Sequence, residues 1–266
     1  MARGPEPVAS VTTAPLFSGV GVALLTIFDS SGAVDAGATA QLAARLVEHG
    51  IRAVLVAGST GEAASLAPEE RAMLVGAVRA ALPSHVVVLA GSGAPSALQA
   101  VHLTKVVLDA GADAVLALSP QQTSDARRYY DLVAEAAAGA PVLAYHFPAA
   151  SAPGLAVAAL GELAVQGLKD SSGDVHRLYE ELEVFTGWLY SGSANLVLLA
   201  GALHCAGVIL AIANLHPELS VRAFEGDANA QRQLVVAADQ VSGPWPHRLK
   251  QAVSARFGSS VTARMG

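Results

Sequence analysis

A regular alternation of short apolar runs with longer amphipathic segments constrains the fold of this 266-residue chain more than any other feature. Eight apolar runs are predicted to be strands, at residues 20–28, 53–57, 86–90, 114–118, 142–147, 165–169, 188–191 and 208–213. Helices are predicted after them, at residues 36–49, 68–81, 96–110, 125–138, 155–163, 175–185, 196–204 and 217–224. The runs are almost continuously apolar, as in parallel sheets covered on both faces. Eight such units predict an α/β fold, a (β/α)8 TIM barrel, with a doubly wound open sheet as the alternative.

Several predicted helix ends have the local signals that such ends require. Asp35, Ser96 and Asp125 stand where N-caps belong, because their side-chain oxygens accept hydrogen bonds from amides of the first turn. Gly50 and Gly111 follow helix ends, where a left-handed backbone is common.

The chain divides into three predicted parts. Residues 1–16 are expected to be a flexible tail, residues 17–225 the barrel and residues 226–266 a short C-terminal helical extension. The extension begins with a helix at residues 228–241, capped by Asp227, and continues from Pro246 as a stretch broken by proline. Trp245, with prolines on both sides, is interpreted as a packing anchor.

Composition excludes several functional classes. The net charge is −6 with acids and bases scattered, so we expect no nucleic-acid partner. The first 16 residues lack the apolar core of a signal peptide, and no apolar stretch approaches the roughly 20 residues that span a bilayer. The single cysteine, Cys205, forms no intrachain disulfide and favours a cytoplasmic location. The eight histidines show no metal-ligand spacing, so no metal is expected.

Lys169 is the most unusual polar residue at a strand end. The chain has three lysines, of which Lys105 falls in a helix and Lys250 in the C-terminal region, where an ammonium is expected to reach water. Lys169 instead ends a predicted barrel strand, on the side where active sites of such barrels lie. Desolvation favours the neutral amine, which attacks carbonyls to form a Schiff base. The alternatives are an ion pair with Asp170 or an ammonium that extends out of the barrel mouth.

Tyr145 ends the preceding strand, about 4.8 Å away in a paired sheet. A phenol near the amine would transfer protons during imine formation, and packing at the rim is the alternative. His146 follows it and should point to the opposite face of the strand.

The second strand ends in Gly58-Ser59-Thr60-Gly61-Glu62. Its two hydroxyls and accessible backbone N–H groups would hold a carboxylate without a fixed positive charge. An ordinary turn bounded by glycines is the alternative, and Glu62 is either an acid/base or an anchor for the loop.

These residues form part of a set of motifs that resembles the dihydrodipicolinate synthase/N-acetylneuraminate lyase superfamily. The resemblance rests on AGSTGE at residues 57–62, YHFP at residues 145–148, GLKDSSGD at residues 167–174 and AGVILAIANLHP at residues 206–217, in this order and spacing. It also includes residues 19–35, 90–94, 110–116 and 191–192, so it covers most of the chain.

The resemblance implies a pyruvate-dependent class I aldolase. By position, Lys169 corresponds to the Schiff-base lysine and Tyr145 to the tyrosine that relays protons. Ser59 and Thr60 correspond to the hydroxyls that hold the pyruvate carboxylate. Two further residues, Gly192 and Ile209, correspond to residues whose backbone lines the imine pocket. The resemblance implies no cofactor, and it implies a homo-oligomer, a dimer or a tetramer.

The sequence also departs from the patterns that bind the second substrate in this superfamily. The synthases usually carry a tyrosine pair where residues 120–122 read Pro-Gln-Gln, and an arginine where residues 149–150 are alanines. The sialic-acid lyases carry acidic residues where residues 193–195 read Ser-Ala-Asn. We therefore expect a lyase or aldolase acting on a 4-hydroxy-2-keto acid, of the 2-keto-3-deoxy sugar acid or 4-hydroxy-2-oxoglutarate type, with pyruvate and an aldehyde as partners. The alternatives are 4-hydroxy-tetrahydrodipicolinate synthase and a non-catalytic paralogue that binds 2-keto acids.

Overall fold

The structure is a computed structural model, and it describes residues 14–121, 125–243 and 245–265. Most of the tail predicted at residues 1–16 therefore lies outside the described residues. Eight parallel strands close into a barrel in sequence order. They are β1 (Gly19–Ala23), β2 (Ala53–Val56), β3 (Val87–Gly91), β4 (Ala114–Leu118), β5 (Val142–His146), β6 (Gly167–Asp170), β7 (Trp188–Ser191) and β8 (Gly207–Leu210). The predicted (β/α)8 barrel is confirmed.

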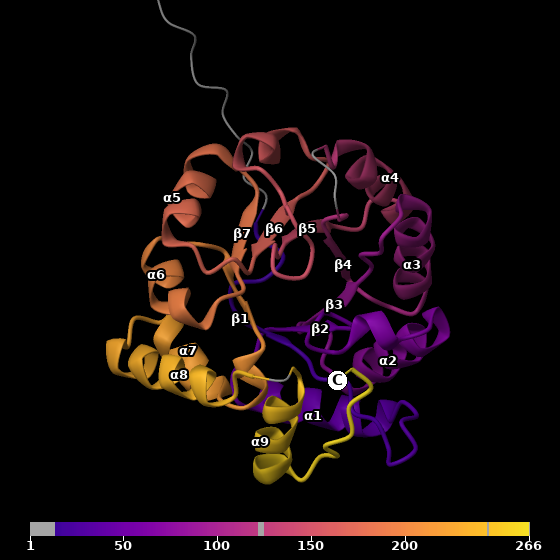
Figure 1. Cartoon of the computed structure of the whole chain (residues 1–266), viewed down its shortest axis with the longest axis vertical. Coiled ribbons are helices and arrows are strands. Elements are labelled where there is room, and N and C mark those ends of the chain that lie inside the picture. Colours follow the sequence, from indigo (N-terminus) through magenta and orange to yellow (C-terminus); the bar gives the residue numbers. More distant parts are fainter. Residues whose placement is uncertain (1–13, 122–124, 244, 266) are drawn as a thin grey trace, which may run out of the picture.

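Helices surround the strands as a ring (Figure 1). Those of the barrel are α1 (Ala36–Glu48), α2 (Pro68–Ala81), α3 (Ala97–Asp109), α4 (Arg127–Ala137), α5 (Val175–Val184), α6 (Val197–Ala202) and α7 (Pro217–Phe224). After α7 follow α8 (Ala228–Gln240) and α9 (His247–Phe257). Among the described residues, no helix is long and apolar enough to cross a membrane.

The structure corrects some predicted element boundaries. The segment at residues 155–163 contains a short 3-10 helix (Val157–Glu162) instead of an α-helix. The predicted first strand is too long, because the amides of Leu25 and Ile27 bond to the side chains of Asn214 and Thr39 rather than to a neighbouring strand.

The predicted helix caps mostly hold. The side chains of Asp35, Ser96 and Asp227 each accept an amide hydrogen bond at a helix start. Asp125 is one residue early: the N-cap of α4 is Ala126, and the Asp125 carboxylate accepts the amide of Arg127. An Asx turn before the helix thus replaces the predicted cap.

Two apolar layers explain why the strands are almost continuously apolar. One lies between the strands and the helices, and the other fills the barrel interior. At the amino-terminal end of the strands, Phe17 stacks on Tyr190 with ring centroids 4.6 Å apart, and the Tyr190 hydroxyl donates to the Phe17 carbonyl. Because these rings fill that end of the barrel, a ligand must enter from the carboxyl ends of the strands.

Candidate active site

Lys169 and Tyr145 face each other inside the barrel, at the carboxyl ends of β6 and β5. The two residues are partners in the parallel register, and the Lys169 Nζ atom lies 4.3 Å from the centre of the Tyr145 ring. Both side chains are buried, with 4% and 5% of their surfaces exposed. Asp170 lies on the opposite face of β6 and pairs with Arg177, so the alternative of a Lys169–Asp170 ion pair is wrong.

A cavity of about 1040 Å³ opens above this pair. Its lining includes all six residues singled out from the sequence, namely Ser59, Thr60, Tyr145, Lys169, Gly192 and Ile209. Among the described residues that line the cavity, Arg71, His102 and Lys169 have basic side chains, and none has an acidic side chain. The cavity therefore suits an anionic ligand whose charge lies near Lys169.

The 58–62 turn, which joins Gly58 to Glu62 after β2, places two hydroxyls in this cavity. The Gly61 amide bonds to the Gly58 carbonyl, and the Thr26 hydroxyl donates to the Gly61 carbonyl at 2.6 Å. A Cβ atom at Gly61 would lie 2.9 Å from the Leu24 carbonyl oxygen, so only glycine fits. The turn is thus packed against the residues that follow β1, while Ser59 and Thr60 line the cavity.

Glu62 ends the turn and is fully buried outside the cavity lining. Its carboxylate lies 2.5 Å from the ammonium of Lys250, also fully buried. Of the two interpretations of Glu62, the structure favours the anchor. The expectation that Lys250 reaches water is wrong, because the ammonium is satisfied by Glu62 and by the Thr262 carbonyl at 2.6 Å.

Gly192, after β7, lets the chain pass close to Lys169. Its amide donates to the Asp170 carbonyl at 2.5 Å. A Cβ atom here would lie 2.9 Å from Lys169 Cε and would overlap the Ser171 hydroxyl. Ser171 also lines the cavity. Sequence reasoning missed it, although its place two residues after Lys169 was a signal that both side chains share a face.

Replacing Gly192 by alanine should displace the Lys169 side chain, because the new methyl group has no room beside Cε. We expect the reactivity of Lys169 toward pyruvate to fall on the order of 10²-fold, as for other small displacements of reacting groups. Trapping by borohydride at a fixed pyruvate concentration measures this. Gly76→Ala is the control, because Gly76 lies in α2 and a Cβ atom there makes only an ordinary contact, 3.8 Å from the Ala110 carbonyl oxygen.

A charged cluster lies on the outer face of β5 and β6, behind Lys169. The guanidinium of Arg177 lies 2.8 Å from the carboxylates of Asp170 and Glu181. His146 points outward, as its position next to Tyr145 predicted, and its Nδ1 accepts the Leu155 amide at 2.8 Å. Burial lowers the pKa of His146 to about 4. Burial and the neighbouring Asp170 raise the pKa of Glu181 to about 9.

The raised pKa of Glu181 predicts how stability depends on pH. The folded chain binds this proton more tightly than the unfolded chain, in which the pKa is near 4.5. Its contribution to stability is thus complete below pH 4.5 and is lost as pH rises toward 9. Glu181→Gln, which keeps the neutral shape, should gain free energy of unfolding relative to the wild type between pH 6 and 9. Urea titrations at several pH values test this, and a difference independent of pH would contradict it.

The position of Trp245 differs from its prediction, and the described side chains offer no metal site. Trp245 was expected to be a packing anchor, but it is 40% exposed and lines the cavity. Proline neighbours alone do not supply the contacts that bury a ring. Within the described part of the chain, no group of three or more His, Cys, Asp or Glu side chains could hold a metal ion.

Fold and cavity together define a (β/α)8-barrel protein with a buried lysine among hydroxyl groups at the carboxyl ends of its strands. The chain matches the dihydrodipicolinate synthetase family over residues 16–258. It therefore belongs to this family and is a lyase.

Individual relatives align with this chain over most of their lengths. An uncharacterized DapA-like lyase of Halobacterium salinarum is 34% identical over 256 residues, which cover 90% of this chain and 84% of that protein. The 4-hydroxy-tetrahydrodipicolinate synthase of Corynebacterium aurimucosum is 32% identical over 246 residues, covering 88% and 80%. The solved dihydrodipicolinate synthase of Acinetobacter baumannii, complexed with pyruvate, has a TM-score of 0.81 at 25% identity, covering 90% and 88%.

Proposed function

We propose that this chain is a class I aldolase that cleaves or forms a 4-hydroxy-2-keto acid through a Schiff base between Lys169 and pyruvate. The observation that carries the proposal is the buried Lys169 amine beside the Tyr145 ring, in a cavity that also contains Ser59 and Thr60. A lysine amine in its neutral form is a nucleophile toward the carbonyl of a keto acid. The pyruvate complex of the Acinetobacter relative supports the choice of the keto acid.

Binding would orient the carboxylate of the keto acid on the 58–62 turn. Ser59 and Thr60 would donate hydrogen bonds to it, which fixes the C2 carbonyl near Lys169 Nζ. Positive charge in the lining would attract the anion, and the lack of acidic side chains among the described lining residues avoids repulsion.

In the cleavage direction, the Lys169 amine attacks C2 and forms a carbinolamine. Tyr145 would donate its phenolic proton to the carbinolamine hydroxyl, which leaves as water and gives a protonated imine. The Tyr145 phenolate would then remove the proton of the C4 hydroxyl. The C3–C4 bond then breaks, its electron pair moves toward the imine nitrogen, and an aldehyde leaves. Protonation of the enamine at C3 and hydrolysis release pyruvate and free the amine.

The aldehyde half of the cavity is mostly apolar. Leu98, Leu103, Phe147 and Trp245 line it, with hydroxyls from residues such as Ser119. Among the described residues, the buried Ser119 hydroxyl has no hydrogen-bond partner, which leaves it for a substrate oxygen. We therefore propose a 2-keto-3-deoxy acid as the first substrate to assay, with 4-hydroxy-2-oxoglutarate beside it, because Arg71 and His102 also line the cavity.

Reduction with borohydride in the presence of pyruvate, followed by peptide mass spectrometry, tests the proposal. We expect one pyruvate adduct, on Lys169, and a wild-type protein without an adduct would overturn the Schiff-base mechanism. Turnover on a panel of 4-hydroxy-2-keto acids then separates an enzyme from a non-catalytic paralogue, which would form the adduct without cleaving any of them.

The name of the Corynebacterium relative makes 4-hydroxy-tetrahydrodipicolinate synthase the second candidate. Condensation of pyruvate with aspartate semialdehyde should therefore be assayed beside the panel. We expect this rate to be low, because residues 149–150 are alanines where the synthases carry an arginine. For the assembly and its location we propose a cytoplasmic homo-oligomer.

Tyr145→Phe removes the phenolic proton and keeps the ring. Because general acid–base catalysis contributes about 10²- to 10⁴-fold, we expect kcat to fall within this range. Pyruvate should still be trapped on Lys169, more slowly than in the wild type. Steady-state kinetics on the best substrate provides the measurement, and an unchanged kcat would exclude Tyr145 as the proton relay.

A further inference from the structure

The last residues of the chain return to the active site. Gly258, in the left-handed conformation at φ +75°, ends α9 and redirects the backbone. The C-terminal segment, residues 259–265, then runs to the end of the chain beside α2 (Figure 1). Met265 lines the same cavity as Lys169. A segment distant in sequence from every predicted site residue therefore forms part of the cavity wall.

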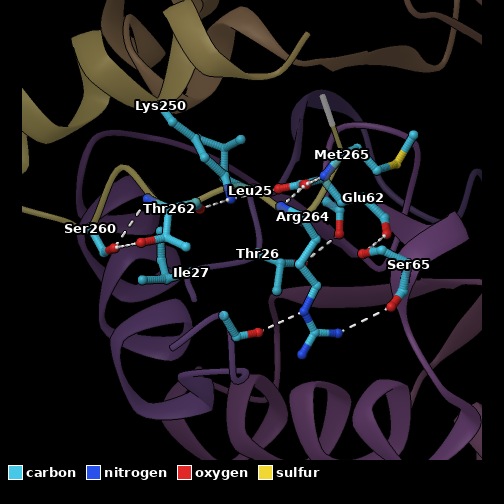
Figure 2. Close-up of polar contacts among 12 residues, drawn as sticks. Leu25, Thr26, Ile27, Glu62, Ser65, Lys250, Ser260, Thr262, Arg264 and Met265 are labelled. Atoms are coloured by element: carbon cyan, nitrogen blue, oxygen red, sulfur yellow. Dashed lines mark hydrogen bonds and ion pairs between the residues drawn. The ribbon is translucent and has the colours of Figure 1, made fainter. Parts of the chain in front are cut away.

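A single buried carboxylate connects this segment to the 58–62 turn. One oxygen of Glu62 accepts the amides of Arg264 and Met265, each at 2.7 Å. The other lies 2.5 Å from Lys250 Nζ on α9, which in turn donates to the Thr262 carbonyl. Figure 2 shows Glu62 beside Arg264 and Met265 of this segment. The last turn residue is thus hydrogen-bonded to the C-terminal segment and paired with α9.

The Arg264 side chain attaches the segment a second time. Its guanidinium forms a two-pronged ion pair with Glu70, at 2.8 and 2.6 Å. It also donates to the carbonyls of Ser65 and Gly32, at 3.0 and 2.7 Å. Bidentate pairs of this kind fix orientation as well as distance. The pair lies in the first turn of α2, directly after the loop that follows Glu62.

Glu62 needs such support, because it adopts a left-handed conformation at φ +57° that side-chain-bearing residues rarely take. Thr60 lies two residues before it. Inside the turn itself, the amides of Gly61, Glu62 and Ala63 bond to carbonyls of Gly58 and Ser59, and from outside it the Thr26 hydroxyl holds the Gly61 carbonyl. Glu62 is the attachment on the other side of the turn, so the geometry of the hydroxyl pair depends in part on how firmly Glu62 is held.

We propose that the C-terminal segment is a working part of the active site, which positions Ser59 and Thr60 for the substrate carboxylate through Glu62. Glu62, Lys250 and Arg264 are then positioning residues, and none of them touches the reacting atoms. This proposal rests on the proposed function for its substrate, but the restraint on the turn is testable without any substrate.

Hydrogen exchange tests the restraint. Two variants are compared with the wild type, one lacking residues 259–266 and the other carrying Arg264→Met, which removes only the side-chain anchor. We expect exchange at the amides of residues 61–63 to accelerate at least about tenfold in the truncated chain and less in Arg264→Met, because local stability sets the opening rate. Peptides of β5 and β6 should be unchanged. Glu162→Gln, in an exposed pair with Arg127, is the matched control.

Borohydride trapping at increasing pyruvate concentrations tests the consequence. In both variants the half-saturating pyruvate concentration should rise, about 5- to 10-fold in the truncated chain, while trapping at saturation reaches the wild-type level. A merely structural role would instead lower the trapped fraction and leave half-saturation unchanged.

The outcomes are separable. Wild-type exchange rates at residues 61–63 in both variants would overturn the positioning role, whether or not pyruvate binds. Absence of trapping in the wild type would overturn the proposed function and leave the exchange result to decide the restraint. If the truncated chain fails to fold, the milder Arg264→Met variant still decides between acceleration and no change.

Discussion

Lys169→Arg is expected to abolish the pyruvate adduct and to lower turnover on the order of 10⁴-fold or more, as when other covalent nucleophiles are removed. Arginine keeps the positive charge, but its guanidinium stays protonated and offers no neutral amine to the C2 carbonyl. The cavity would still bind the carboxylate through the 58–62 turn. The measurements are peptide mass spectrometry after borohydride reduction and kcat on the best substrate of the panel.

Lys105→Arg is the matched control, since Lys105 is exposed on α3 and should tolerate the change in both assays. Partial activity of Lys169→Arg would contradict covalent catalysis and would favour a barrel that works by non-covalent chemistry. An adduct that moved to another lysine would show that the reactive amine had been assigned wrongly.

Of the substitutions considered for stability, Lys250→Met is expected to lower the free energy of unfolding most. The substitution has a similar volume, but it leaves the Glu62 carboxylate buried without its cation. Breaking a buried pair in this way costs about 3–5 kcal/mol. For a domain of this size that corresponds to a fall in Tm on the order of 10 °C. Urea unfolding and calorimetry measure both quantities.

The double variant Glu62→Gln, Lys250→Met separates charge from shape. With both charges removed, no carboxylate is left unpaired, and we expect most of the lost stability to return. Arg127→Met in the exposed pair with Glu162 should leave the free energy of unfolding nearly unchanged, because water screens that pair. If Lys250→Met were equally harmless, the buried pair would not hold the C-terminal segment.

Most of the fold was predictable because strand and helix periodicity is a local property of the sequence. Helices α2 and α7 begin and end at the predicted residues, since Pro68 and Pro217 mark their first turns. The failures occur where tertiary contacts outweigh local pattern. Residues 24–28 are as apolar as a strand, yet the amides of Leu25 and Ile27 bond to the side chains of Asn214 and Thr39 instead of to a neighbouring strand.

For the candidate site too, some features follow from the sequence and others only from tertiary contacts. The sequence by itself determined which polar residues stand at strand ends, and in a closed parallel barrel those ends meet, so Lys169, Tyr145 and the 58–62 turn converge in one cavity. Only the tertiary structure decided what surrounds them. Glu62 and Lys250 are far apart in the chain, and no local propensity links a turn after β2 to a lysine on α9. Their contact requires the barrel to close and α9 to dock first, because burial of both charges is favourable only when each has the other as its partner.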